Sequence, residues 1–276
     1  MDSSLRPHLA LTGPNPVPDS GSFNTYYLRQ IGVASPIAEA LSRKGEGLSS
    51  AVEANVIQDG LSPEPVDQIP AEHVSPAPKG ESVAATHVEA QADDLAGLSV
   101  AASTCTACEL SGSRNQVVFG VGAKHADVLF IGEAPGEQED EQGEPFVGRA
   151  GQLLNQMLAA VQWSRDSVYI MNVIKCRPPG NRDPKPEEVL ACSRWFDAQW
   201  ALLQPKVVCL LGRVAAQRML GTDAPLSSLR GRWHEYHGVP VWVTYHPAYL
   251  LRSPSKKAIA WQDFRQLAAR CERPEA

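Results

Sequence analysis

Polar residues that could do chemistry follow three separate apolar runs in the chain. Glu133 closely follows the first run, Asn172 lies near the end of the second, and His246 follows the third. A carboxylate, an amide and an imidazole can together bind a planar polar ligand and move a proton. A single Asn or His at a strand end is most often structural. Three such groups beyond neighbouring parallel strands indicate a ligand site.

The segment after Gly132 is a second candidate. It runs for about sixteen residues before a helical pattern begins at Gly148, which is long for a connection in an α/β protein. Its one aromatic residue, Phe146, could stack on a planar ligand or anchor the loop to the core. Its acids could be a solvated surface or the ligands of a divalent metal; they are Glu137, Glu139, Asp140, Glu141 and Glu144.

Four of the six cysteines form another pattern, a CxxC pair followed by two single residues: Cys105, Cys108, Cys176 and Cys192. In an intracellular protein this spacing favours metal or redox chemistry over disulfides. Zinc prefers two close pairs, whereas iron–sulfur clusters accept scattered single ligands. Cys209, inside an apolar run, is expected to be a small core residue, and Cys271 to be incidental.

Strands and helices that alternate along the chain must position these groups. The predicted strands cover residues 117–119, 128–131, 168–174, 206–211 and 239–245. The predicted helices cover residues 152–161, 186–203, 214–220 and a last segment from Pro254 or Ser255 to Arg270. Because the strands are apolar on both faces and separated by helices, we expect a three-layer α/β/α fold with a mostly parallel, four-stranded central sheet.

Composition divides the chain near residue 100. Residues 1–100 contain no Cys or Trp and carry 13 acidic and 5 basic side chains, whereas the remainder carries 18 acidic and 20 basic ones. Proline repeated among Ala, Glu and Ser predicts that residues 1–100 are a disordered acidic tail. Within it, residues 23–40 could form a short helix that docks on a protein partner, or only a transient local cluster of apolar side chains. Residues 101–276 then form the folded domain, whose charge permits a nucleic-acid partner.

The N-terminus has no pattern typical of a signal peptide, and no stretch approaches the roughly 18 apolar residues of a membrane span. We therefore expect a soluble, cytoplasmic protein that binds no membrane.

The motifs GEAPGEQED, EPFVGRAG, NVIKCRPP and HPAYLL occur in this order together with the four cysteines. In these motifs the chain resembles the family 4 uracil-DNA glycosylases, the iron–sulfur branch found in bacteria and archaea. The resemblance covers about residues 100–272. It implies a monomeric base-excision repair enzyme that flips deoxyuridine out of single- or double-stranded DNA, hydrolyses its N-glycosidic bond and leaves an abasic site.

The resemblance assigns three catalytic positions. His246 matches the histidine that donates a hydrogen bond to uracil O2 as negative charge develops there. Asn172 matches the residue that recognises the uracil edge. Glu133 and Asn172 are both candidates to position the attacking water.

The resemblance also places Glu133, Ala134 and Phe146 around the base, with Phe146 as the stacking aromatic. Other branches of the superfamily have Asp or Asn where this chain has Ala134. Glu139 is the candidate to occupy the space beside uracil C5 and so to exclude thymine, which a pocket otherwise rejects by only about 1 to 3 kcal/mol.

The segment after His246 resembles the loop that wedges into the emptied base stack, with Leu250, Leu251 and Arg252 as candidates. The leucines could instead be ordinary core residues.

The four cysteines named above match the ligands of a structural [4Fe-4S] cluster in the same family. Two other classes of protein stay open from the sequence. One is a non-catalytic iron–sulfur module of the same fold that binds DNA or takes part in replication. The other is a divalent-metal hydrolase that uses the acidic loop.

Overall fold

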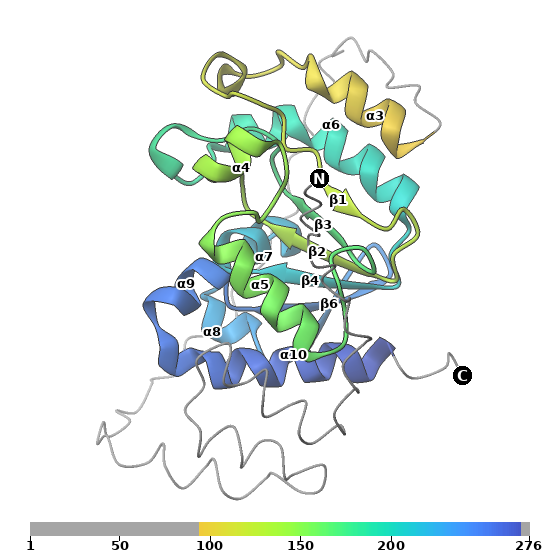
Figure 1. Ribbon diagram of the computed structural model, residues 1–276, viewed down its shortest axis with the longest axis vertical. Coiled ribbons are helices and arrows are strands. Elements are labelled where there is room, and N and C mark those ends of the chain that lie inside the picture. The colour runs from red at the N-terminus through yellow and green to blue at the C-terminus, as the bar shows by residue number, and fades with distance from the viewer. Residues whose placement is uncertain (1–93, 272–276) are drawn as a thin grey trace, which may run out of the picture. The chain divides into compact units, whose positions relative to one another are not determined.

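The computed structural model describes residues 94–271 (Figure 1). The predicted tail up to residue 93, with its predicted helix at 23–40, lies outside the described residues. The first described helix, α3 (Leu95–Ser103), is capped by Asp94, whose Oδ1 accepts a hydrogen bond from the Gly97 N–H at 2.7 Å. The predicted domain start at residue 101 lies inside this helix.

A six-stranded sheet in the order β1-β3-β2-β4-β6-β5 forms the middle of the domain. Its four inner strands are parallel, and β1 and β5 pair antiparallel at the two edges. The prediction of four strands is therefore right for the parallel part and wrong for the total. The strands are β1 (Val121–Gly122), β2 (Val128–Gly132), β3 (Tyr169–Asn172), β4 (Val207–Leu211), β5 (Trp233–Tyr236) and β6 (Val239–Thr244).

Both edge strands lack the apolar run that marks the inner strands. Strand β5 has the sequence WHEY with no fully buried side chain, and β1 has only two residues. Residues 117–119, predicted as a strand, are instead a connection in which the Val118 N–H donates to the Lys175 carbonyl oxygen at 2.8 Å. Edge strands are held mainly by backbone pairing with a neighbour, which leaves a weak pattern in the sequence.

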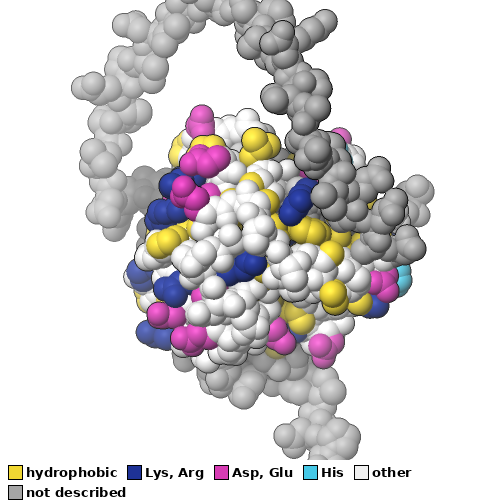
Figure 2. All heavy atoms as spheres, turned by 90° about the horizontal axis from the view of Figure 1, so that it is seen from above, with side chains coloured by type: hydrophobic (Ala, Val, Ile, Leu, Met, Phe, Trp, Pro, Cys, Tyr) yellow, Lys and Arg dark blue, Asp and Glu magenta, His cyan; other side chains and the backbone are white. Residues whose placement is uncertain are grey.

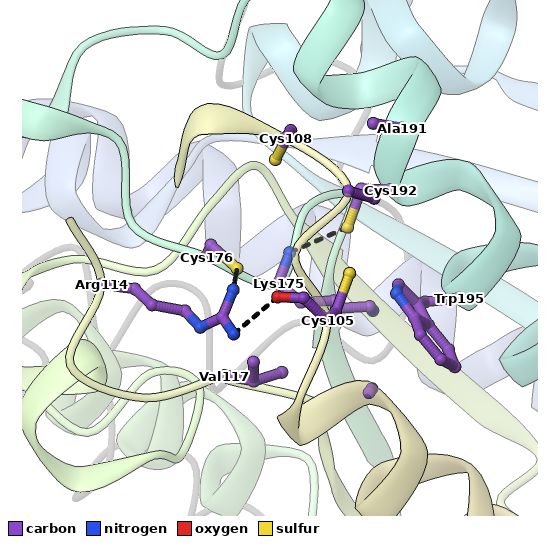
Figure 3. A pocket seen from close by; sticks show the side chains of 11 residues that line it. Cys105, Cys108, Arg114, Val117, Lys175, Cys176, Ala191, Cys192 and Trp195 are labelled. Carbon is purple, nitrogen blue, oxygen red and sulfur yellow. Dashed lines mark hydrogen bonds between the residues drawn. The ribbon is translucent and has the colours of Figure 1, made fainter. Parts of the chain in front are cut away.

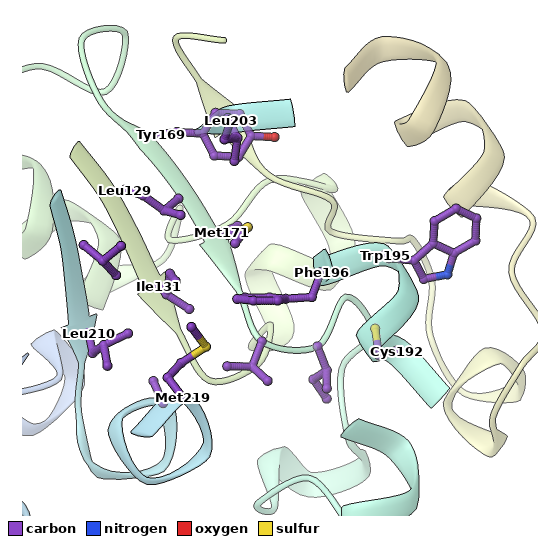
Figure 4. Packing of buried hydrophobic residues seen from close by; sticks show 14 of the residues in the cluster. Leu129, Ile131, Tyr169, Met171, Cys192, Trp195, Phe196, Leu203, Leu210 and Met219 are labelled. Carbon is purple, nitrogen blue, oxygen red and sulfur yellow. The ribbon is translucent and has the colours of Figure 1, made fainter. Parts of the chain in front are cut away.

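The sheet has a core on each face because successive strand residues point to opposite sides. In β2, Leu129 and Ile131 belong to a core shared with α3, α6 and α7, whereas Val128 and Phe130 belong to a core shared with α5, α9 and α10. Figure 4 shows the first core, with Phe196 of α6 facing the sheet. The expected three-layer α/β/α architecture is confirmed.

The helices after α3 are α4 (Glu137–Gln142), α5 (Arg149–Ala160), α6 (Pro186–Leu203), α7 (Arg213–Leu220), α8 (Leu226–Leu229), α9 (Pro247–Arg252) and α10 (Lys257–Cys271). Helix α6 has the predicted bounds, because Pro at its first position and the acids that follow suit a helix start. The short helices α4, α8 and α9 were not predicted, and α4 interrupts the long loop after β2. None of the helices in residues 94–271 has the length and apolar character needed to cross a membrane.

Candidate active site

A cleft of about 550 Å³ opens beyond the carboxyl ends of β2, β3, β4 and β6. All six residues predicted around the substrate line it: Glu133, Ala134, Glu139, Phe146, Asn172 and His246. They come from the ends of two strands, from α4, from the loop before α5 and from the start of α9. The parallel sheet brings them together because its strands end at one edge.

Asn172 ends β3 opposite Gly132 of β2 and is 1% exposed. Its Oδ1 is buried and accepts no hydrogen bond from any described residue. Gly132 leaves the space that this amide needs, since a side chain there would place its first carbon 2.4 Å from Oδ1 and 2.6 Å from the Phe146 ring. A buried acceptor without a donor costs about 1 to 3 kcal/mol, so this site suits a ligand that supplies an N–H group.

Phe146 is buried against the cleft and has a backbone φ of 55°, which is unusual for an aromatic residue. Two side chains hold this turn. Glu139 Oε1 accepts hydrogen bonds from the N–H groups of Val147 and Gly148, each at 2.9 Å. Arg165 Nη1 donates to the Phe146 carbonyl oxygen at 3.0 Å. Glu139 thus both lines the cleft and fixes the loop that carries the aromatic ring.

His246 is the N-cap residue of α9, and its ring centroid lies 5.5 Å from that of Phe146. Its Nδ1 accepts a hydrogen bond from the Ala248 N–H at 3.1 Å, so the neutral ring carries its proton on Nε2. Loss of hydration, and then the charge of Arg252, lower the pKa of His246 to about 4. Gly212, at φ +94°, lets the backbone pass close to the imidazole, since a Cβ there would lie 2.8 Å from that of His246.

Glu133 follows β2 at the cleft wall and is half-buried. Burial, and then the charge of Asp183, raise the pKa of its carboxyl to about 7, although Arg213 and Arg218 oppose the shift. Its carbonyl oxygen accepts from the Ile174 N–H at 3.2 Å, which extends the pairing of β2 and β3. Near neutral pH this carboxyl can therefore either hold or accept a proton.

The acids of the α4 loop have different partners. Asp140 is buried and accepts hydrogen bonds from the N–H groups of Asn115 and Gln116, so it anchors the segment before β1. Glu137 is exposed and forms an ion pair with Arg177 at 3.6 Å. With Glu139 bonded to the backbone as described, three of these acids already have structural contacts.

The predicted wedge residues differ in their placement. Leu250 is fully buried in the core shared by α5, α9 and α10, as the structural interpretation of the leucines expects. Leu251 is half-buried, and Arg252 lines the cleft at the end of α9. Tyr249, which was not predicted, is 36% exposed at the cleft and stacks on Tyr245 with ring centroids 5.2 Å apart.

A second, smaller cavity lies on the α3 and α6 side of the sheet (Figure 3). Its lining includes all four cysteines of the predicted cluster, and we call it the cysteine cavity: Cys105, Cys108, Cys176 and Cys192. The first two lie between α3 and the following 3₁₀ turn, the third lies after β3, and the fourth lies in α6. Segments distant in sequence thus converge on one space.

Two arginines donate hydrogen bonds to sulfur atoms of this lining, while burial raises the pKa of the Cys176 thiol to about 11 and also raises that of Cys192. Arg114 Nη1 donates to Cys176 Sγ at 3.3 Å, and Arg194 Nη2 donates to Cys105 Sγ at 3.2 Å. None of the described Asp or Glu residues lines the cavity. Within residues 94–271 no three metal-binding side chains are close enough together to hold a single ion. Four cysteine sulfurs around one cavity are a donor set that iron–sulfur clusters use.

Sequence reasoning missed the residues that support both sites. Arg114 contacts a cysteine 62 positions away, and Arg165 contacts the Phe146 turn 19 positions away. Nothing in the local spacing around either arginine marks it, because both bonds depend on the tertiary fold. Only the CxxC motif and the strand-end positions gave a local signal.

The sequence profile of the uracil DNA glycosylase superfamily matches residues 119–265, a segment that contains every strand of the sheet and all six predicted cleft residues. The chain therefore belongs to the uracil DNA glycosylase superfamily.

Curated relatives define the branch. The type-4 uracil-DNA glycosylase of Archaeoglobus fulgidus is 41% identical over 176 residues, which cover 61% of this chain and 88% of the relative. The type-4 enzyme of Sulfurisphaera tokodaii is 39% identical over 184 residues, 63% of this chain and 84% of the relative. That of Thermotoga maritima is 44% identical over 155 residues, 55% and 81% respectively. The resemblance to family 4 is confirmed.

Proposed function

We propose that this protein is a DNA-repair uracil-DNA glycosylase that flips deoxyuridine out of DNA, hydrolyses the N-glycosidic bond and leaves an abasic site. The observation that carries the proposal is the unpaired, buried Oδ1 of Asn172 in the cleft that Phe146 and His246 also line. A flipped base that stacks on the ring and presents an N–H group to the amide suits this arrangement.

Uracil has the required pattern of donors and acceptors. Its N3–H can donate to Asn172 Oδ1, and its O4 can accept from the amide nitrogen of the same side chain. Cytosine presents an acceptor and a donor in the reverse order. Each buried group left unpaired by cytosine costs about 1 to 3 kcal/mol, which gives the selectivity for uracil.

Cleavage breaks the C1′–N1 bond, and both electrons leave with uracil, so that negative charge spreads onto O2. In this mechanism the neutral His246 donates its Nε2–H to O2. Such stabilisation of an oxyanion contributes on the order of 3 to 4 kcal/mol. Because the pKa of His246 is lowered to about 4, the ring remains a neutral donor at physiological pH.

Water completes the reaction by bonding to C1′ and losing a proton. Glu133 is the proposed acceptor of that proton, since its pKa near 7 leaves much of it ionised at neutral pH. Glu139 is proposed to fill the space beside C5 of the base, which would exclude the methyl group of thymine. Leu251 and Arg252 on α9 are proposed to contact the strand from which the base has left.

We also propose that the cysteine cavity holds a [4Fe-4S] cluster, which can carry an electron when bound. Hydrolysis requires no electron, so the role assigned to the cysteines is structural. Their bonds to the cluster would tie the segment before β1 to the connection after β3 and to α6. The protein is further proposed to act as a cytoplasmic monomer on single- or double-stranded DNA.

The test is incubation of the purified protein with a labelled duplex that contains one U·G pair, in excess EDTA, followed by alkaline cleavage at abasic sites. We expect cleavage at the uracil only, and none in a matched C·G duplex. Absence of cleavage in both duplex and single-stranded substrates, by folded protein that contains its cluster, would instead favour the non-catalytic DNA-binding module.

A further inference from the structure

Lys175 is a buried cation without a carboxylate partner. It is 1% exposed and is the one Lys or Arg among the described residues in the buried class. It forms no ion pair with an Asp or Glu of the described chain. Burying an uncompensated ammonium group is costly, and a nearby anion offsets that cost.

The ammonium group has one strong contact, and that contact is with the active site. Lys175 Nζ donates a hydrogen bond to the Asn172 carbonyl oxygen at 2.8 Å. The remaining contacts are the faces of Phe119 and Phe196, whose ring centroids lie 5.9 Å and 5.8 Å away. Aromatic faces attract a cation weakly compared with an anion at the same distance, so they do not replace one.

The same residue also belongs to the cysteine cavity. Lys175 lines this cavity, and its backbone N–H donates to Cys192 Sγ at 3.4 Å, as Figure 3 shows. Its neighbour in the chain, Cys176, lines the same cavity. On the outer surface, by contrast, Lys and Arg side chains lie beside Asp and Glu side chains along the left edge of the face in Figure 2.

We propose that Lys175 is a positioning residue that couples the cysteine cavity to uracil recognition. The anionic thiolates that hold the proposed cluster compensate its charge, and the ammonium in turn fixes the backbone of Asn172, the residue that recognises uracil. The inference rests on the proposed function and cluster. It adds a specific route by which cluster loading controls the shape of the base pocket.

The test compares K175M, which removes the charge and keeps an unbranched side chain one atom shorter, with K206M. Lys206 is exposed and pairs with exposed Asp127, so K206M is the same substitution without the buried site. Two quantities are measured on protein that contains its cluster: the reduction potential of the cluster, and the concentration of free uracil that half-inhibits the enzyme.

For K175M we expect a more negative potential, because loss of a nearby positive charge favours the oxidised cluster. We expect the half-inhibiting uracil concentration to rise roughly tenfold, because the Asn172 backbone has lost its hydrogen bond. K206M should match the wild type in both. Wild-type values for K175M in either quantity would overturn the coupling.

If K175M cannot be purified with its cluster, K175R decides the question. This variant keeps the charge, so it is expected to load the cluster and show the wild-type potential; failure to load would contradict the proposal. Failure of the proposed function looks different. In that case wild-type protein would not release uracil from DNA, while the comparison of potentials would still report on Lys175.

Discussion

The active-site cleft and the cysteine cavity lie at the two ends of one short segment, Asn172 to Cys176, and they differ in whether their hydrogen-bond acceptors have donors. In the cleft, Asn172 Oδ1 has no partner and Glu133 has a pKa near 7. In the cavity, sulfur atoms receive hydrogen bonds from arginine and backbone donors. A site for a transient ligand keeps its bonding groups free, whereas a site for a permanent group surrounds it with matched charge.

The substitution His246→Ala should remove most of the activity of the cleft and leave the cysteine cavity intact. We expect kcat on a U·G duplex to fall about 100- to 1,000-fold, because the donor to uracil O2 is lost. Single-turnover cleavage measures this, with exposed His125→Ala as the matched control. Near-wild-type turnover by folded H246A would remove the histidine from the mechanism.

A pH profile sharpens the assignment of Glu133. Below about pH 7 its carboxyl is protonated and cannot accept a proton from water, so kcat should fall roughly tenfold per pH unit as the solution is made more acidic. His246, with its pKa near 4, stays neutral through this range. In Glu133→Gln the slope should disappear along with most of the rate. An unchanged slope in that variant would assign the titration to another group.

The substitution Cys192→Ser should disrupt the cysteine cavity directly and affect the cleft only as a consequence. We expect several-fold less soluble protein and loss of the brown colour that the proposed cluster would give, since that cluster would lose one ligand from α6. Cys271→Ser, on the opposite face of the sheet, is the control. A colourless, stable and fully active C192S protein would contradict a structural role for the cluster.

Glu139 gives the most discriminating effect. Glu139→Ala should release a little thymine from a T·G duplex and lower kcat on uracil about tenfold, because the turn at Phe146 loses two hydrogen bonds. Glu139→Gln keeps an oxygen for those bonds and fills the same space, so it should resemble the wild type on both substrates. Thymine left untouched by folded E139A would exclude Glu139 as the barrier beside C5.

The sequence was informative where a local pattern reports on burial. Apolar runs located all four inner strands, and the polar residues after them marked the edge of the sheet where the cleft opens. The CxxC pair and two single cysteines gave four of the residues that line the cavity. Edge strand β5 and the short helices α4 and α9 were not predicted from the sequence. Elements of so few residues show no periodic pattern of apolar side chains.

What the sequence by itself determined is the class of fold, the family and the identities of the residues at both sites, because these depend on residue type and order. Only the tertiary structure decided that Leu250 is core, that Glu139 and Arg165 hold the Phe146 turn, and that Lys175 lies between cleft and cavity. Those features depend on which side chains, distant in the sequence, come into contact. Such contacts are set by the packing of whole layers, which no short stretch of sequence encodes.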